Sequence, residues 1–139
     1  DMEAYVARLK GRLDPVTGWL QATFDSVRQN PKRVIFAEGE DPAVIRAANT
    51  YFAQGFGAPI LVGTKDIIRK RFQELGIPLR PEFDIIDTNF SSHAEEFAEF
   101  LYQRLQRRGH LKRDCERIVR NERNVFAALM VVHGHASAM

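Results

Sequence analysis

The sequence has one cysteine, no long hydrophobic run and almost no excess of either charge, and each absence excludes a class of protein. Cys115 stands alone among 139 residues, which excludes an internal disulfide framework and is typical of a reducing cytoplasm. The longest apolar run, residues 125–132, is too short to span a bilayer. Twenty basic and 18 acidic residues leave a formal charge of +2, which gives no strong attraction to nucleic acid or acidic membranes. We therefore expect a cytoplasmic domain without a membrane partner.

Glycine and proline are also scarce, with 9 and 6 residues, and 45% of the chain is hydrophobic, so extensive disorder is excluded. A length of 139 residues suits one domain, or part of one, that can bury a core. The chain begins at Asp1 without a methionine and ends at Met139, soon after its apolar run. Because a buried apolar segment needs further elements to cover it, we expect an excerpt of a longer polypeptide.

Helical and strand-like segments alternate along the chain. Short, continuous apolar segments predict three buried strands, over residues 33–37, 59–63 and 83–87. Apolar residues at helical spacing predict helices over residues 16–29, 42–54, 64–75, 92–108, 112–120 and 122–132. Helix starts are indicated by Asp14-Pro15, by Asp41-Pro42 and by a capping box formed by Ser92 and Glu95. This order predicts an α/β fold of parallel βαβ units: a partial, open, mostly parallel sheet in three layers with flanking helices.

The carboxyl ends of parallel strands meet at one edge of a sheet, and ligands bind there in folds of this class. The residues expected along this edge are Glu38, Gly39, Glu40, Asp41, Gly63, Thr64 and residues 87–89. The carboxylates around Gly39 would repel a phosphate, so a capped tight turn explains this segment; a functional role for Glu38 or Glu40 is the alternative. Gly55 and Gly57 precede a strand instead of following one, so we interpret them as a helix terminator and not as a dinucleotide loop.

Two local patterns that could carry chemistry have simpler explanations. His133 and His135 could be half of a metal site, yet no cysteine or carboxylate stands at ligand spacing beside them. We interpret them as the end of a helix and predict no metal ligands. Cys115 lies among arginines, which could lower its pKa, but no histidine stands four residues away to activate it. An inert helical thiol is the expected state.

A basic cluster occupies residues 104–123, which contain eight basic and three acidic residues. Its members are Arg104, Arg107, Arg108, Lys112, Arg113, Arg117, Arg120 and Arg123. Arginines suit a phosphate-bearing ligand, because a guanidinium donates two parallel hydrogen bonds to it. A solvated helix face, balanced by acidic residues upstream, explains the cluster equally well. No recognisable module or run of exposed aromatics accompanies it, so we expect no nucleic-acid partner.

Residues 32–48, KRVIFAEGEDPAVIRAA, closely resemble the opening strand and helix of phosphate acetyltransferase and phosphate butyryltransferase domains. Residues 55–63 resemble that family's next strand, and residues 101–109 resemble its long helix and the glycine after it. Residues 125–132 resemble the apolar helix before its central Gly-Asp-Ala-Asp segment. The resemblance implies a phosphotransacetylase-like (isocitrate dehydrogenase-like) fold, of which residues 31–139 form a truncated first lobe.

Residues 1–28 resemble the connector to the malic enzyme module in bifunctional bacterial NADP-dependent malic enzymes, so residues 1–30 are expected to be a connector and a helix leading into the domain. The resemblance implies a parent that oxidatively decarboxylates malate to pyruvate with NADP and Mg²⁺ or Mn²⁺. It further implies that this chain is non-catalytic, senses acetyl-CoA and self-associates as a homo-oligomer. In the family an arginine of the long helix contacts coenzyme A. Leu105 holds the matching position, so the flanking Arg104 and Arg107 are predicted to bind acetyl-CoA or CoA.

The sequence departs from the family at the end of the chain. Where the family has Gly-Asp-Ala-Asp, this chain has Gly134-His135-Ala136-Ser137, so both acids are absent. The family's catalytic serine, arginine and aspartate belong to the second half of its domain, so no catalytic residue is predicted here. The alternative hypothesis is a fragment of a genuine phosphate acetyltransferase, which transfers acetyl groups between phosphate and coenzyme A.

Overall fold

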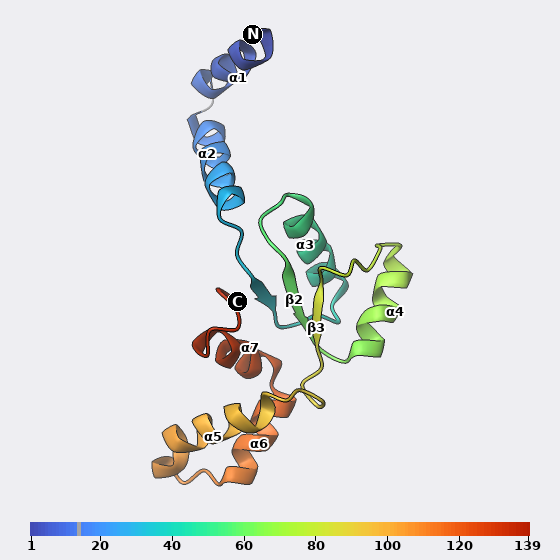
Figure 1. Cartoon of the computed structure of the whole chain (residues 1–139), viewed down its shortest axis with the longest axis vertical. Coiled ribbons are helices and arrows are strands. Elements are labelled where there is room, and N and C mark those ends of the chain that lie inside the picture. Colours follow the sequence, from blue (N-terminus) through green and yellow to red (C-terminus); the bar gives the residue numbers. More distant parts are fainter. Residues whose placement is uncertain (14) are drawn as a thin grey trace.

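The computed structural model describes residues 1–13 and 15–139. Two helices, α1 (Met2–Leu13) and α2 (Pro15–Gln29), precede the body of the domain and extend away from it (Figure 1). The predicted helix start at Pro15 is confirmed, whereas Asp14 lies outside the described residues. Residues 1–13, expected only as a connector, form α1 because apolar residues recur in them at helical spacing. No helix among the described residues has the length and apolar character needed to cross a membrane.

Three parallel strands form the open sheet that the alternation predicts. They are β1 (Val34–Phe36), β2 (Pro59–Val62) and β3 (Asp84–Ile86), and they lie side by side in that order. Ile35 lies opposite Ile60 in the register of β1 and β2. On the other edge of β1, Ala138 forms a single parallel bridge with Val34, so the end of the chain returns to the sheet.

Helices cover both faces of the sheet, so the predicted three layers are confirmed (Figure 1). The helices of the two faces are α3 (Pro42–Ala53) and α4 (Lys65–Leu75) on one side, and α5 (Ala94–Leu105), α6 (Lys112–Asn121) and α7 (Arg123–Val132) on the other. Side chains of β2 alternate between these faces: Leu61 packs against α3 and α4, while Ile60 and Val62 pack against the other layer.

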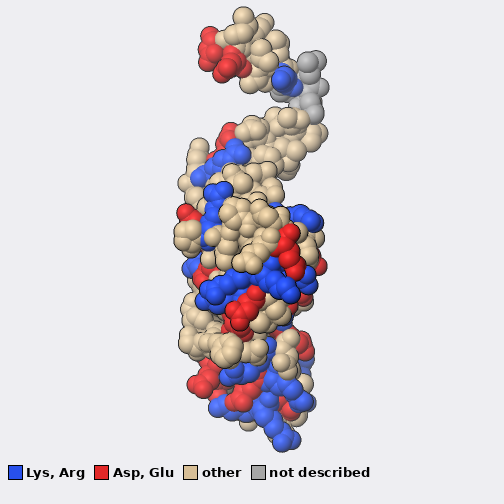
Figure 2. Space-filling view, turned by 90° about the vertical axis from the view of Figure 1, so that its right-hand side faces the viewer, with Lys and Arg blue, Asp and Glu red and all other residues tan. Residues whose placement is uncertain are grey.

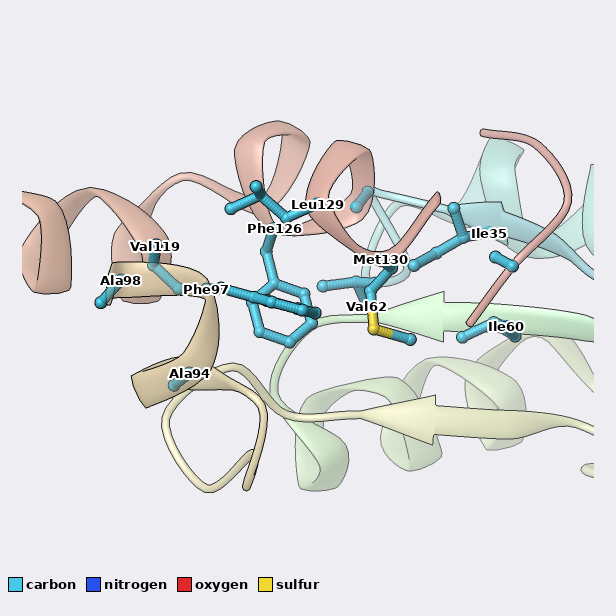
Figure 3. Packing of buried hydrophobic residues seen from close by; sticks show 12 residues of the cluster. Ile35, Ile60, Val62, Ala94, Phe97, Ala98, Val119, Phe126, Leu129 and Met130 are labelled. Atoms are coloured by element: carbon cyan, nitrogen blue, oxygen red, sulfur yellow. The ribbon is translucent and has the colours of Figure 1, made fainter. Parts of the chain in front are cut away.

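The larger core lies between β2 and the C-terminal helices (Figure 3). Phe97 of α5 and Phe126 of α7 are fully buried, with ring centroids 5.1 Å apart and planes at 67°. Met130 of α7 extends towards Val62 of the sheet (Figure 3). Burying side chains of this size contributes about 1.5–3 kcal/mol each, so this cluster fixes the C-terminal helices on the sheet.

Local signals place most helix ends correctly. Asp41 caps α3 as predicted, because its Oδ1 accepts hydrogen bonds from the amides of Ala43 at 2.7 Å and Val44 at 3.4 Å. Gly55, in the left-handed region with φ of 77°, follows the C-cap of α3, which confirms the helix-terminator interpretation.

The predicted start of the long helix is wrong, whereas its predicted stop at Gly109 is confirmed. Ser92 and Glu95 form no capping box: α5 begins at Ala94, and its first turn receives no side-chain cap. The preceding residues form a turn, in which the Ser91 hydroxyl accepts a hydrogen bond from the His93 amide at 3.2 Å. At the other end, the chain tightens after Leu105 into a 3₁₀ turn, η1 (Gln106–Arg108), which ends at Gly109 with φ of 86°.

Candidate functional site

The carboxyl edge of the sheet brings together the turns predicted to lie there. The Gly39 amide donates to the Val62 carbonyl at 2.9 Å, which joins the turn after β1 to the end of β2. The Lys65 amide donates to Oδ2 of Asp87 at 3.4 Å, which joins the start of α4 to the turn after β3. The expected gathering of these residues along one edge is therefore confirmed.

Gly39 occupies a place where no side chain fits. A Cβ atom built there would lie 2.8 Å from the Val62 carbonyl oxygen and 3.1 Å from the Cβ of Leu61. Backbone this close cannot move aside without disturbing the sheet. The turn after β1 therefore presses against β2, which confirms the tight-turn interpretation of this segment.

Glu40 is the centre of a polar network at this edge. Its Oε1 accepts hydrogen bonds from the Thr64 amide and from Nη2 of Arg123, both at 2.7 Å. Burial raises the pKa of Glu40, but the hydrogen bonds from Thr64 and Arg123 outweigh burial, so the pKa is lowered overall. Glu38 lies 3.9 Å from Nη1 of the same arginine. Glu40 is thus an ionised link between the sheet and the start of α7.

The last turn of α6 is likewise joined by hydrogen bonds to the turn after β3. The Thr88 hydroxyl donates to the Arg120 carbonyl at 2.8 Å, and Nη1 of Arg120 donates to the Asn89 carbonyl at 2.9 Å. A hollow of about 370 Å³ beside this fastening is lined by Glu38 and by residues 121–124. Arg123 is already paired with two carboxylates, so its charge is not available to a phosphate. Its arrangement holds the sheet and the C-terminal helices together.

Several members of the basic cluster pair with carboxylates of the same chain at the surface. Arg117 pairs with Asp114 at 2.7 Å, and Lys112 pairs with Glu99 at 3.1 Å. On the face shown in Figure 2, basic and acidic side chains are interspersed over the lower part of the molecule. The paired members match the solvated-face interpretation.

Arg104 and Arg107, the predicted ligand residues, lie at the end of α5 that points away from the sheet (Figure 1). Both side chains are exposed. The guanidinium carbon of Arg104 lies 4.7 Å from the centroid of the Phe100 ring, which holds its planar group over an aromatic face. The structure therefore separates these two arginines from Arg120 and Arg123, which lie at the carboxyl edge.

The two histidines near the C-terminus acquire neighbours that the sequence does not indicate. His93 and Glu96, some forty residues earlier, lie beside His135, and one ligand atom from each of the three falls within 4.8 Å of the others. Local spacing cannot reveal this group, because the packing of α5 against α7 creates it. Cys115, by contrast, is fully buried, and burial raises the pKa of its thiol, which agrees with the predicted inert state.

Comparison with known proteins identifies the fold and its relatives. The family described as phosphate acetyl/butaryl transferase matches residues 19–139. This chain belongs to that family. The transferase-family domain is 39% identical over 140 residues to an NADP-dependent malic enzyme of Rhizobium meliloti (strain 1021), an alignment that covers 100% of this chain and 18% of the enzyme.

A second relative comes from the transferases themselves. The chain is 32% identical over 108 residues to a phosphate acetyltransferase of Helicobacter pylori (strain J99), with 78% of this chain and 20% of that protein covered. The chain thus spans about a fifth of the length of these curated relatives. Among solved structures, EutD phosphotransacetylase from Staphylococcus aureus matches with a TM-score of 0.71 and 21% identity, over 83% of this chain and 36% of that chain. This structural likeness shows the fold alone.

Within the family domain, the motif at residues 32–48 corresponds to β1, the tight turn at the carboxyl edge and the first half of α3. The sequence correctly predicted the strand, the tight turn and the helix start of this motif. It did not reveal that Arg123 closes the turn from the far end of the chain, 83 residues away.

Proposed function

We propose that this chain is the phosphotransacetylase-like domain of an NADP-dependent malic enzyme, where it senses acetyl-CoA and is not itself catalytic. The observation that carries the proposal is the alignment with the Rhizobium meliloti malic enzyme, which includes the whole chain but only 18% of the enzyme. The parent would oxidatively decarboxylate malate to pyruvate with NADP and Mg²⁺ or Mn²⁺. No residue of this chain is assigned to holding NADP or that metal.

We assign residues 1–30 to the connector with its leading helix, and residues 31–139 to the first lobe of the domain. Packing supports this division. α1 continues from α2 away from the body, and α2 meets the body through its C-terminal end (Figure 1). There Nε of Arg28 donates to the Gln54 carbonyl at 2.7 Å, and the rings of Phe24 and Phe56 lie 5.3 Å apart. A helix docked at one end suits a segment that leads from another module.

Acetyl-CoA is an anion with a 3′-phosphate and a diphosphate, and exposed arginines are the side chains that hold such groups best. Arg104 fits this role because the Phe100 ring keeps its guanidinium plane oriented while its side chain stays exposed. Arg107, in η1, lies one turn further along. Lys112 is less suitable, because Glu99 holds its ammonium at 3.1 Å. The two arginines would bind phosphate oxygens, and the sensing would come from different affinities of two enzyme states for the ligand.

The end of the chain supports a non-catalytic role. Where the family has its central acids, this chain has His135 and Ser137. The Ser137 amide donates to the Arg33 carbonyl at 2.8 Å, so this segment is held beside β1 by its backbone. Neither residue supplies the carboxylate that the family pattern has there.

Self-association and a cytoplasmic location complete the proposal. Trp19 of α2 is 67% exposed and Tyr5 of α1 is 59% exposed, and aromatic side chains of this kind are enriched at protein interfaces. Light scattering after gel filtration tests this: a mass at a multiple of the chain mass supports the oligomer, and a monomer at all concentrations contradicts it.

The test of acetyl-CoA sensing uses the full-length parent, with malate-dependent formation of NADPH as the readout. We expect acetyl-CoA to inhibit, and the double variant Arg104→Ala/Arg107→Ala to raise the half-inhibitory concentration about tenfold or more, since charge-assisted hydrogen bonds are lost. Arg69→Ala, an exposed arginine on α4 at the opposite face of the sheet, is the matched control and should leave inhibition unchanged. Calorimetry showing no acetyl-CoA binding to the intact parent would remove the regulatory role.

The similarity to the Helicobacter pylori phosphate acetyltransferase favours one other candidate, a working transferase. It predicts that the full-length protein makes acetyl-CoA from acetyl phosphate and coenzyme A. Turnover that is independent of malate and NADP would establish this alternative. No turnover, combined with malate oxidation, would support the proposed malic enzyme.

A further inference from the structure

Three imidazoles and one carboxylate converge where the start of α5 meets the residues that follow α7. His93 precedes α5, Glu96 lies in its first turn, and His133 and His135 follow α7. Nδ1 of His93 lies 4.0 Å from Oε2 of Glu96, and Nε2 of His133 lies 4.0 Å from Oε1 of the same carboxylate. The rings of His93 and His135 have centroids 4.3 Å apart. Both atom pairs are too far apart for a hydrogen bond, so these groups face one another across a narrow gap.

The hydrogen bond of His133 fixes which of its nitrogens faces this gap with a lone pair. Nδ1 of His133 lies 2.8 Å from the Leu129 carbonyl oxygen. A carbonyl oxygen can only accept, so Nδ1 carries the proton, and in the neutral ring Nε2 presents a lone pair. That lone pair faces the Glu96 carboxylate, which is also only an acceptor. Nε2 of His133 and the Glu96 carboxylate, 4.0 Å apart, are therefore both available to a bound cation.

The imidazole rings of His93 and His133 pack against phenylalanine rings of α5. His133 lies 4.8 Å from both the Phe97 and the Phe100 ring centroids, and His93 stacks on Phe97 at 5.6 Å. Phe97 is fully buried, so the imidazoles rest on a rigid part of the core. Glu96 is the movable member, because its side chain is 59% exposed. This combination keeps the nitrogens in place and leaves the carboxylate free to adjust.

Two imidazoles and one carboxylate, with water as the fourth ligand, suit a tetrahedral metal site. Bonds of about 2.0–2.2 Å to imidazole nitrogen and carboxylate oxygen place ligand atoms roughly 3.3–3.5 Å apart. The ligand atoms of His93, Glu96 and His135 lie within 4.8 Å of one another, so modest side-chain movements would bring them to this spacing around an ion. The Leu129 carbonyl fixes the orientation of His133, which lies beside these ligands.

We propose that His93, Glu96 and His135 bind a divalent transition-metal ion of the zinc class, with His133 beside them. Imidazole-rich sites bind Zn²⁺, Ni²⁺ and Cu²⁺, whereas Mg²⁺ and Ca²⁺ prefer oxygen ligands alone. The ion would neutralise Glu96 and join the start of α5 to the segment after α7. The site lies at the opposite end of α5 from Arg104 and Arg107, so this inference stands independently of the proposed acetyl-CoA role.

The test measures Zn²⁺ binding to the protein by competition with a chromophoric chelator, in an excess of Mg²⁺ that occupies oxygen-only sites. We expect one equivalent of Zn²⁺ to bind. His93→Gln and His135→Gln should each lower the affinity about tenfold or more, because each removes one ligand. Glu96→Gln should lower it as well, since the neutral amide replaces a charged ligand. Co²⁺ should give the visible d–d bands of a low-coordinate site, which the same variants should abolish.

The matched control is His110→Gln, because His110 is the one histidine of the sequence that lies outside this group, in the turn before α6. It should bind Zn²⁺ as the unchanged protein does. No stoichiometric binding, or binding that only His110→Gln removes, would overturn the proposal. Circular dichroism checks that each variant is folded, and Glu96→Gln decides the question if a histidine variant is not, because its side chain is largely exposed.

Discussion

Replacing Glu40 tests whether the hydrogen bonds at the carboxyl edge of the sheet stabilise the fold. Glu40→Ala removes the acceptor of two 2.7 Å hydrogen bonds, one from the Thr64 amide and one from Arg123. Hydrogen bonds to a charged group contribute about 1.5–3 kcal/mol each, so we expect the free energy of unfolding to fall by about 3 kcal/mol. Glu40→Gln keeps an oxygen that can accept from the Thr64 amide but loses the charge. We therefore expect the free energy of unfolding to fall by about 1.5 kcal/mol. Urea denaturation near neutral pH measures both values.

The effect of Glu40→Gln should depend on pH in a definite direction. The pKa of Glu40 in the folded chain lies below its ordinary value of 4.5, because hydrogen bonds from Thr64 and Arg123 outweigh burial. A carboxyl whose folded pKa is lowered stabilises the fold fully above its unfolded pKa and loses that contribution as the pH falls through the folded pKa. The difference in unfolding free energy between the two proteins should therefore be full near neutral pH and shrink steadily below about pH 4.5.

A matched substitution on α4 separates this network from an ordinary surface ion pair. Glu74 pairs with Arg71 at 3.0 Å, but the two side chains are 46% and 44% exposed. Such pairs contribute about 0–1 kcal/mol, so Glu74→Gln should change the unfolding free energy by no more than about 0.5 kcal/mol. Equal losses for Glu40→Gln and Glu74→Gln, or a Glu40 effect that persists unchanged in acid, would refute the reasoning.

Three further predictions concern the core, the turn and the thiol. Phe126→Ala should lower the unfolding free energy by about 3–5 kcal/mol in urea, because the fully buried ring leaves a cavity; a loss below about 1 kcal/mol would contradict this packing. Gly39→Ala should cost about 1–3 kcal/mol, seen as a lower melting temperature, because the new Cβ would lie 2.8 Å from the Val62 carbonyl; an unchanged melting temperature would show that the turn can move. Cys115 should react with a thiol reagent only in denaturant, since it is fully buried and burial raises the pKa of its thiol; rapid modification of the native chain would contradict this.

Features set by neighbouring residues could be predicted from the sequence. The cap at Asp41 and the stop at Gly55 depend on a few adjacent atoms, and both are confirmed. The three-layer fold followed from the alternation of apolar strands and helices, because a parallel sheet must be covered on both faces. The prediction that the long helix starts at Ser92 was wrong, because the turn after β3 contains a hydrogen bond from the His93 amide to the Ser91 hydroxyl.

Features set by packing between distant segments could not be predicted in this way. Arg123 donates a hydrogen bond to Glu40, which lies 83 residues earlier in the sequence. His135 lies beside Glu96, about forty residues earlier. The composition of the basic cluster could not show that Arg120 and Arg123 bind the turns at the carboxyl edge of the sheet. Arg104 does not, because it lies on the part of α5 that points away from the sheet (Figure 1). Only the three-dimensional arrangement distinguishes members with structural partners from members at the surface.

The position of α5 sets a limit on how the two proposed sites can influence each other. His93 and Arg104 stand eleven residues apart, which is about 16 Å along a helix with a rise of about 1.5 Å per residue. At physiological salt, exposed charges are screened over about 8 Å, so the charge of an ion at Glu96 reaches the arginines only weakly. Any effect of metal on the response to acetyl-CoA must therefore pass through the packing of α5 against α6 and α7. Such an effect should be lost when that packing is loosened by Phe126→Ala, whereas a direct charge effect should respond to salt instead.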